Sequence, residues 1–410
     1  MRVLYFHQHF TTPTIGGGTR SYEFAERLIA RGHQVTMVCG GNHDFNLAAT
    51  GINGVTRGSI DNIDLIQIKV PYANKMGLVD RAKSFAQYAL VGRKIAKKLR
   101  DDYDIVFSTS TPLTAGLPGI YAKRKFKKPF VFEVRDLWPA LPKALGMKNP
   151  FFITAMSIIE KKSYHKADGC IGLSPGICDG IRARSQEGKS IEMIPNGCDL
   201  ELFKPGDRKN LQLEGIKPTD TVAIFTGAHG IANGLDAILN AATVLKQRGR
   251  NDIALVFIGD GRLKPGLEER AKKEGLDNCH FFKPISKTQL KDIVASVDIG
   301  LMCLKNVPAF YYGTSPNKFF DYIASGLPVL NNYPGWLADM IKENKCGLAV
   351  EPDNAEVYAD ALIYLADHPE ERKTMGANAR KLAERDFNRD DLADKFVNFL
   401  ENVYEKKYSL

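Results

Sequence analysis

Short apolar runs alternate with longer amphipathic segments along most of the chain. Runs that predict strands begin near residues 3, 35, 64, 104, 130, 169 and 192, and again near residues 222, 253, 279, 299, 329 and 348. Residues 20–31 and 82–100 have the spacing of linking helices. This alternation is typical of βαβ units with parallel strands, so the pattern predicts an α/β fold.

The length favours two domains, because 410 residues divide naturally into two units of about 200. Residues 194–205 form a segment rich in turn residues and bounded by prolines. We therefore place the first domain at residues 1–205 and the second at residues 206–386. From about residue 387 the pattern predicts a C-terminal helix that completes the first domain, with its apolar face formed by Leu392, Phe396, Phe399, Leu400 and Val403.

Composition narrows the class of protein. The seven cysteines are scattered without metal-ligand spacing, as is typical of reduced thiols. No apolar run approaches the ~20 residues of a membrane span. Residues 2–6 already predict a strand, so we expect no signal peptide. A cytoplasmic protein is the expectation.

The positive charge is uneven. Residues 1–200 hold 28 Lys+Arg against 17 Asp+Glu, a net +11, whereas residues 201–410 hold 28 against 30, a net −2. The excess concentrates between Lys69 and Lys128. Such a surface attracts anionic lipid, although ordinary solvated helix faces give the same pattern. Nucleic acid is not an expected partner, because no recognised binding module accompanies the charge.

Residues 315–330 read as a capped helix followed by a buried strand. Ser315 suits the N-cap and Pro316 the first helical position. Lys318 and Asp321 project from roughly one side of this helix. A lysine near the amide-rich helix start suits a phosphate, and a carboxylate one turn later can accept hydrogen bonds from hydroxyl groups. The plain alternative is a solvated pair on an amphipathic helix.

Three predicted strands end in loops rich in glycine or polar residues. Residues 15–20 carry three glycines, and residues 226–234 and 258–264 form similar strand-to-helix turns. Such turns bring backbone amides close to an anion. A fourth strand ends in Arg-Asp-Leu-Trp-Pro at residues 135–139. A nicotinamide enzyme is disfavoured, because neither half presents GxGxxG with an acidic residue about 20 positions later.

Taken together, these motifs resemble retaining glycosyltransferases of family 4 (group 1). The resemblance rests on the residues 315–330 helix, the Pro-Asn-Gly segment at residues 195–197, and Gly-His-Gln-Val at residues 32–35. It implies the GT-B fold, in which two Rossmann-like domains face each other across a cleft. The Arg-Asp-Leu-Trp-Pro form is similar to a subgroup acting on bacterial surface polysaccharides, such as N-acetylfucosamine transferases of O-antigen and capsule pathways.

The resemblance also assigns roles to single residues. Asp136 and Arg135 occupy the catalytic strand end, where many members carry histidine. Arg135 could bind phosphate, and Asp136 could orient the acceptor hydroxyl or take its proton. The alternative is an Arg-Asp pair that braces the loop. The residues expected to contact the donor are Gly17, Gly18, His229, Asn233, Arg262, Lys264, Pro284, Ser315, Asn317, Lys318 and Asp321.

Two family positions are altered in this chain. The family has two glutamates separated by seven residues, and here Asp321 takes the second position while Gly313 takes the first. The arginine and lysine that clamp the diphosphate are also absent, with His229 near one position and Asn233 at the other. Backbone amides and Lys318 would therefore have to supply the contacts.

The resemblance implies a retaining transferase that moves a sugar from a nucleoside diphosphate, expected to be UDP, to a lipid-linked or saccharide acceptor. No metal or cofactor is expected. The expected location is the inner face of the cytoplasmic membrane, with the basic surface against anionic lipid. A sugar-nucleotide 2-epimerase and an inactive sugar-nucleotide-binding protein on the same fold are the alternatives.

Overall fold

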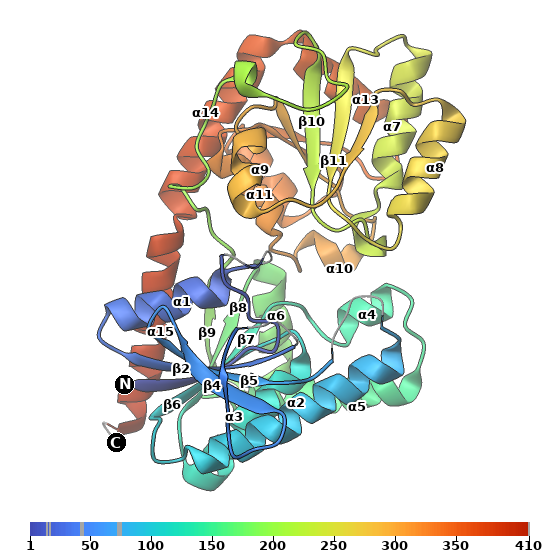
Figure 1. The fold of residues 1–410 in the computed structure, drawn as a ribbon. Coiled ribbons are helices and arrows are strands. Elements are labelled where there is room, and N and C mark those ends of the chain that lie inside the picture. Colours follow the sequence, from blue (N-terminus) through green and yellow to red (C-terminus); the bar gives the residue numbers. More distant parts are fainter. Residues whose placement is uncertain (14, 16–17, 42–44, 72–75, 409–410) are drawn as a thin grey trace. The chain divides into compact units, whose positions relative to one another are not determined.

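The computed structural model describes residues 1–410 except residues 14, 16–17, 42–44, 72–75 and 409–410. The chain divides into two compact units (Figure 1). The first comprises Met1–Pro195, Gly313–Ser315 and Asp390–Leu410, and the second comprises Asn196–Tyr312 and Pro316–Arg389. Within the described residues, no helix is both long enough and apolar enough to cross a membrane.

The first unit is built on a nine-stranded sheet with the order β3-β4-β5-β2-β1-β6-β7-β8-β9. Its strands are β1 (Arg2–Phe6), β2 (Gln34–Gly40), β3 (Ala48–Ala49), β4 (Val55–Ile60), β5 (Ile63–Ile68), β6 (Ile105–Thr109), β7 (Phe130–Val134), β8 (Gly169–Gly172) and β9 (Ser190–Met193). Among the described residues of this sheet, the β3–β4 and β4–β5 pairings are antiparallel and the others are parallel. The central strands are buried on both faces, which explains their near-continuous apolar sequences.

Helices cover the sheet of the first unit. They are α1 (Arg20–Ala30), α2 (Leu78–Lys98), η1 (Leu113–Ala115), α3 (Gly116–Phe126), α4 (Ala140–Ala144), α5 (Pro150–Lys166), α6 (Pro175–Arg184) and α15 (Arg389–Tyr408). One apolar cluster joins α2, α3 and α6 to the sheet, and a second joins α1 and α15 to it. The sheet is therefore covered on both faces, as a parallel sheet requires.

The second unit holds a six-stranded parallel sheet with the order β12-β11-β10-β13-β14-β15. Its strands are β10 (Thr221–Thr226), β11 (Ile253–Ile258), β12 (Cys279–Phe282), β13 (Ile299–Met302), β14 (Val329–Asn331) and β15 (Gly347–Ala349). Strand order reverses between β10 and β13, and ligands of doubly wound sheets bind at such switch points. The α/β fold with parallel sheets that the pattern predicts is confirmed.

The helical elements of the second unit complete its layers. They are η2 (Arg208–Asn210), η3 (Ile231–Asn233), α7 (Asp236–Gln247), α8 (Lys264–Glu274), α9 (Lys287–Val294), α10 (Pro308–Tyr311), α11 (Asn317–Ala324), α12 (Trp336–Glu343), α13 (Ala355–Asp367) and α14 (Pro369–Asp386). Helices α7 and α13 share one apolar cluster with the sheet. The loop after β10 leads through η3 into α7, and the loop after β13 leads through α10 to α11.

The C-terminal helix α15 packs on the first sheet. The Phe396 ring stacks on Phe24 at 4.2 Å between centroids and meets Phe107 edge-on at 4.9 Å. Phe399 and Val403 lie so close to Gly169 that a Cβ there would come within 2.7 Å of the Phe399 ring. This contact requires glycine at the start of β8.

The boundary between the units lies earlier than the sequence suggested. The structure groups residues 196–205 with the second unit rather than the first. The Arg380 guanidinium of α14 donates hydrogen bonds to the carbonyl oxygens of Leu200 and Phe203, and the Phe203 side chain is fully buried. These long-range hydrogen bonds leave no signal in the local sequence.

Candidate functional site

Helix α11 carries the two residues singled out by the sequence. Its apolar face buries Phe319, Phe320 and Ile323. The N-cap is Pro316, without a side-chain hydrogen bond, so the prediction of Ser315 as the cap is wrong. Ser315 lies before the helix and is partly buried, whereas Asn317 is exposed.

Lys318 projects from the first turn of α11 toward the loop after β10. Its Nζ donates to Asn233 Oδ1 at 2.9 Å and lies 3.9 Å from the centroid of the Phe225 ring. Burial disfavours the charged ammonium and lowers the pKa of Lys318 to about 7. The lysine therefore has a neutral amide and an aromatic face as partners, and it retains donor capacity for an anion.

In the loop after β10, Gly227 adopts a positive φ, and Asn233 forms a hydrogen bond to the loop backbone. Gly227 has φ +125°, and a Cβ on it would come within 3.4 Å of Lys318 Cε. Asn233 Nδ2 donates to the Ala228 carbonyl oxygen at 2.7 Å, which leaves its Oδ1 for Lys318. Asn233 thus orients the lysine.

Asp321 lies one turn further along α11 and is 7% exposed. Its Oδ1 is 3.7 Å from Lys287 Nζ, which begins α9. An ionised carboxylate offers about four lone-pair sites. Asp321 can therefore accept hydrogen bonds from ligand hydroxyl groups in addition to the lysine contact.

His229, which the sequence analysis expects to contact the donor, lies within an aromatic cluster. Its side chain is fully buried, and its ring centroid lies 6.1 Å from Phe225 and 6.3 Å from both Phe257 and Phe281. Burial, aided by the nearby positive charge of Lys264, lowers the pKa of His229 to about 4. The ring is neutral at pH 7 and cannot replace the missing family cation.

Lys264 and Arg262, the other two cations expected to contact the donor, differ in exposure. Lys264 is buried, and its Nζ donates to the carbonyl oxygens of Gly259 at 2.9 Å and Phe282 at 2.6 Å. It braces the ends of β11 and β12, so the prediction of a phosphate contact is not supported for this side chain. Arg262 and Pro284 are exposed.

In the first unit, Arg135 and Asp136 follow β7 and are both partly buried. Arg135 Nη1 lies 3.4 Å from His7 Nε2, and Asp136 Oδ2 accepts from Thr111 Oγ1 at 3.3 Å. Burial raises the pKa of Asp136, while the Arg135 charge and the Thr111 hydrogen bond oppose that shift. A carboxyl group of this kind is suited to proton transfer.

Sequence reasoning missed the histidines beside this pair. His7 and His9 directly follow β1, and burial together with the Arg135 charge lowers the pKa of both, that of His9 to about 4. His7 is 2% exposed, and its Nδ1 has no hydrogen-bond partner among the described residues. The His-Gln-His sequence at a strand end was the available signal.

Of the two predicted glycines, Gly18 accepts a hydrogen bond from Thr11, and Gly17 lies outside the described residues.

A second missed feature is a buried ion pair. Arg20, which opens α1, donates from Nε and Nη2 to Glu133 Oε1 at 3.0 and 2.8 Å. Glu133 Oε2 accepts from Thr109 Oγ1 at 2.7 Å. The pair ties α1 to β6 and β7, two residues before Arg135.

Two family models match the chain. Residues 15–202 match the model described as Glycosyltransferase Family 4, and residues 207–382 match the model described as Glycosyl transferases group 1. The chain belongs to the group 1 glycosyltransferases. The resemblance inferred from the motifs is thus confirmed at the level of this family and of the GT-B fold.

Among curated relatives of this transferase, D-inositol 3-phosphate glycosyltransferase 2 of Catenulispora acidiphila is 26% identical over 69% of the chain and 67% of its own length. Other curated relatives are matched over 46–65% of their length. Sucrose-phosphate synthase from Thermosynechococcus elongatus has a similar fold, with a TM-score of 0.79, 17% identity and 99% coverage of both chains. Anabaena HepE, solved in complex with UDP-glucose, gives a TM-score of 0.70, 14% identity, and coverage of 98% of this chain and 100% of that chain.

Proposed function

We propose that the protein is a retaining glycosyltransferase that moves a sugar from a UDP-sugar to a saccharide or lipid-linked acceptor in bacterial surface polysaccharide synthesis. The observation that carries the proposal is Lys318. Its ammonium group lies 2.9 Å from Asn233, the residue at the position where related enzymes carry a lysine. The positive charge of Lys318 comes from α11 and is directed at the same loop.

Lys318 would bind the diphosphate of the donor. The ammonium group lies beside Gly227, where backbone can approach a phosphate closely. As the bond to the sugar breaks, negative charge accumulates on the departing diphosphate, and a preorganised cation stabilises it. Because the leaving group is stabilised by amides and Lys318, no protein nucleophile is required in this proposal.

Asp321 would accept hydrogen bonds from the ribose hydroxyls. Its carboxylate is buried and one turn from Lys318, so the two side chains suit adjacent parts of one nucleotide. The exposed Pro284 loop after β12 would hold the base through its backbone. The choice of UDP is supported by HepE, whose structure holds UDP-glucose on a similar fold.

The acceptor would bind at the β1, β6 and β7 strand ends of the first unit. Asp136 would orient or deprotonate the acceptor hydroxyl, and its raised pKa favours that role. Arg135 would pair with a phosphate of a lipid-linked acceptor, while His7 remains uncharged beside it. The Arg-Asp-Leu-Trp-Pro segment supports an acceptor of the type used by N-acetylfucosamine transferases.

A nucleotide-sugar screen tests the activity. Ligand at ~100 times its dissociation constant adds roughly 2.7 kcal/mol to stability, so UDP-sugars should raise the melting temperature clearly more than GDP- or ADP-sugars. A hit should then release UDP only when a saccharide acceptor is supplied. Conversion of the sugar nucleotide without any acceptor would indicate an epimerase, and binding without hydrolysis or transfer would indicate an inactive binding protein.

The basic surface of the first unit would attach the enzyme to the inner face of the cytoplasmic membrane. Lys97 and Lys98 on α2 and Arg124 and Lys125 on α3 are exposed, and the two helices are in contact. Leu90 on α2 is also 57% exposed. Each basic residue near an anionic surface contributes ~1 kcal/mol, so four suffice for reversible attachment.

Sedimentation with phosphatidylglycerol vesicles tests this attachment. The wild type should pellet at low salt and dissociate at high salt. A variant with all four basic residues changed to glutamine should stay in the supernatant. Lys123 is left unchanged, because its Nζ pairs with Asp168 at 2.6 Å. Equal pelleting of variant and wild type would contradict the proposal.

A further inference from the structure

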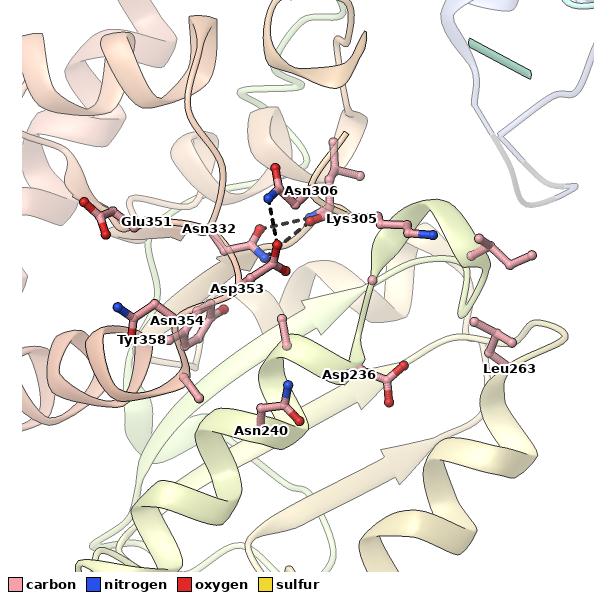
Figure 2. A pocket seen from close by; sticks show the side chains of 15 residues that line it. Asp236, Asn240, Leu263, Lys305, Asn306, Asn332, Glu351, Asp353, Asn354 and Tyr358 are labelled. Atoms are coloured by element: carbon pink, nitrogen blue, oxygen red, sulfur yellow. Dashed lines mark hydrogen bonds between the residues drawn. The ribbon is translucent and has the colours of Figure 1, made fainter. Parts of the chain in front are cut away.

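The second unit contains a pocket of about 300 Å³, which lies among the first turns of α7 and α13 and the loops after β13, β14 and β15 (Figure 2). Asn306 donates to Asp353 Oδ2 at 2.7 Å, and the Asn332 amide is held by the backbone of Leu304 at both ends. Because these polar groups are already paired within the protein, they do not point to a ligand. The unassigned surface that does point to a partner lies in the first unit.

Helix α5 of the first unit buries its polar half and exposes its apolar half. Its buried residues are Glu160, Ser163 and Tyr164, all in its second half. Its first half contains the apolar-rich run of residues 151–159, in which no residue is buried. Phe151 is 86% exposed and Ile158 is 49% exposed. Large apolar side chains are normally found in the interior, so the first half of α5 lacks a partner for its apolar surface.

The exposed residues of α5 form a continuous stripe. Phe151, Ala155, Ile158 and Lys162 are exposed, and they lie at positions i, i+4, i+7 and i+11, which is the spacing of one helix face. The large apolar residues that flank this stripe are half-buried, namely Phe152, Ile153, Met156 and Ile159. The stripe is therefore apolar from residue 151 to residue 158 and positively charged at its end.

The segment that precedes α5 joins this apolar surface through an aromatic contact. The half-buried Trp138 ring meets the Phe152 ring edge-on, with 6.3 Å between the centroids. Helix α4, which lies between these two residues in the chain, has no buried residue (Figure 1). Tryptophan is enriched where protein meets the boundary between lipid and water, because its ring is apolar and its N–H is polar.

The exposed charges of residues 137–166 are all positive. The acidic residue of this segment, Glu160, is 3% exposed and pairs with Arg184 at 2.7 Å. The lysines of the segment are all exposed, namely Lys143, Lys148, Lys161, Lys162 and Lys166. An apolar stripe accompanied by lysines is complementary to an anionic lipid surface, which offers acyl chains below a layer of negative charge.

Two other arrangements fit this surface less well. In a symmetric dimer the same face would meet itself, so the lysines would face lysines, and juxtaposed like charges disfavour an interface. Residues 151–159 extend only about 14 Å along a helix axis, less than half of the ~30 Å thickness of a bilayer core. Insertion of one helix face into a membrane is compatible with this length, whereas a membrane span is not.

We propose that the apolar stripe of α5, residues 151–158, inserts into the interfacial region of an anionic bilayer. The helix would lie in the plane of the membrane, with Phe151 and Ile158 among the upper acyl carbons and Lys162 at the level of the lipid phosphates. This inference rests on the proposed membrane attachment through α2 and α3, and it adds an apolar contact to that attachment. Helix α3 contacts both α2 and α5, so the basic and apolar surfaces are close together.

Sedimentation of the full chain with phosphatidylglycerol vesicles over a range of salt concentrations tests the insertion. Phe151→Ser should lower the partition coefficient about tenfold or more at every salt concentration, as expected when one phenyl ring is lost from an apolar environment. The dependence of binding on salt should be unchanged, because no charge is removed. Since Phe151 is 86% exposed in the free protein, the variant should keep the melting temperature of the wild type.

Ile231→Ser is the matched control. Ile231 is 51% exposed and belongs to the second unit, so this variant should partition like the wild type. A second measurement reports the depth of the stripe. Lipids brominated on their acyl chains should quench the additional tryptophan emission of Phe151→Trp, and they should not quench that of Ile231→Trp.

The outcomes separate the insertion from the electrostatic attachment. If the wild type binds vesicles but Phe151→Ser binds equally well, or if Phe151→Trp is not quenched, the insertion is overturned and the attachment through α2 and α3 stands. If the wild type does not bind vesicles at low salt, the attachment fails together with the insertion. If the chain is a dimer that Phe151→Ser converts to a monomer, the stripe is an interface between two copies and the insertion is overturned.

Discussion

Two cations with limited exposure, the buried Arg20 in the first unit and the partly buried Lys318 in the second, are held by different kinds of partner. Arg20 in the first unit is 7% exposed and contacts a carboxylate and two backbone carbonyls, with Glu133 Oε1 at 2.8 Å and the Ile194 and Pro195 carbonyl oxygens at 2.7 and 2.6 Å. Lys318 in the second unit has, among the described residues, a single hydrogen-bond acceptor, the neutral side chain of Asn233. The protein gives Arg20 a counter-ion and several hydrogen-bond acceptors, whereas it gives Lys318 neither a counter-ion nor a second acceptor among the described residues.

This difference separates a structural cation from a functional one. A buried charge is tolerated when a partner of opposite charge and further hydrogen bonds compensate for lost hydration. No carboxylate of the described residues pairs with Lys318, and burial lowers its pKa to about 7. A diphosphate would supply the missing negative charge. The charge of Lys318 is therefore unfavourable in the free protein, and binding of the proposed donor would offset that cost.

The largest change in unfolding free energy should come from breaking the Arg20–Glu133 ion pair. Glu133→Gln leaves Arg20 buried without its counter-ion, and removing one partner of a buried ion pair costs ~3–5 kcal/mol of unfolding free energy. Chemical denaturation would measure this loss. As a matched control, Arg248→Met removes a cation that is 37% exposed and should change stability by less than ~1 kcal/mol.

A smaller but more selective effect is expected for Lys318→Met. UDP should bind ~1.5–3 kcal/mol more weakly, as for a hydrogen bond to a charged group, while uridine, which lacks the diphosphate, should be nearly unaffected. The unfolding free energy should stay equal or rise, because a partly buried charge that pairs, among the described residues, only with a neutral amide and an aromatic ring is removed. Calorimetry with both ligands measures this contrast. Equal losses for UDP and uridine would show that Lys318 acts through folding.

The titration of Lys318 sharpens the same comparison. Because the folded pKa is lowered to about 7, the free lysine loses its proton as pH rises through that value, and UDP binding must then restore it. UDP affinity should therefore fall above pH 7, by at most about tenfold per pH unit. The pH dependence of UDP affinity should disappear in Lys318→Met. It should persist in Arg262→Met, because the Arg262 side chain is exposed.

The lowered pKa of Lys318 also makes the stability of the protein depend on pH. Between about pH 7 and the usual lysine pKa the unfolded chain binds more protons than the folded chain, so the Lys318 contribution to stability becomes more favourable as pH rises. The stability difference between wild type and Lys318→Met should narrow over this window. A difference that is constant from pH 6 to pH 10 would contradict the lowered pKa.

The smallest effect is expected for Asp321→Asn. The amide keeps one acceptor oxygen for a ribose hydroxyl but loses the charge, so UDP and uridine should both bind about 0.5–1.5 kcal/mol more weakly. Equal losses for the two ligands would distinguish Asp321 from Lys318. Unchanged affinity for both would remove Asp321 from the nucleotide site.

The sequence was most informative where chemistry is local. The Lys318 and Asp321 spacing on one helix, the glycine turn at Gly227 and the parallel strands all follow from neighbouring residues. It was least informative about side chains whose partners are distant in the chain. Lys264 looked like a free cation at a helix start, yet its ammonium group binds carbonyls of two separate strand ends.

By itself, the sequence determined the α/β class, the family and the helix that carries Lys318, because hydrophobic periodicity and turn chemistry act over a few residues. Only the tertiary structure decided which polar groups are free to act. His229 is enclosed by three phenylalanines and Arg20 is neutralised by Glu133. Within the described residues, Asn233 is the one hydrogen-bond acceptor of Lys318. Burial and long-range pairing determine the charge state and availability of a side chain, and neither is written in its local sequence.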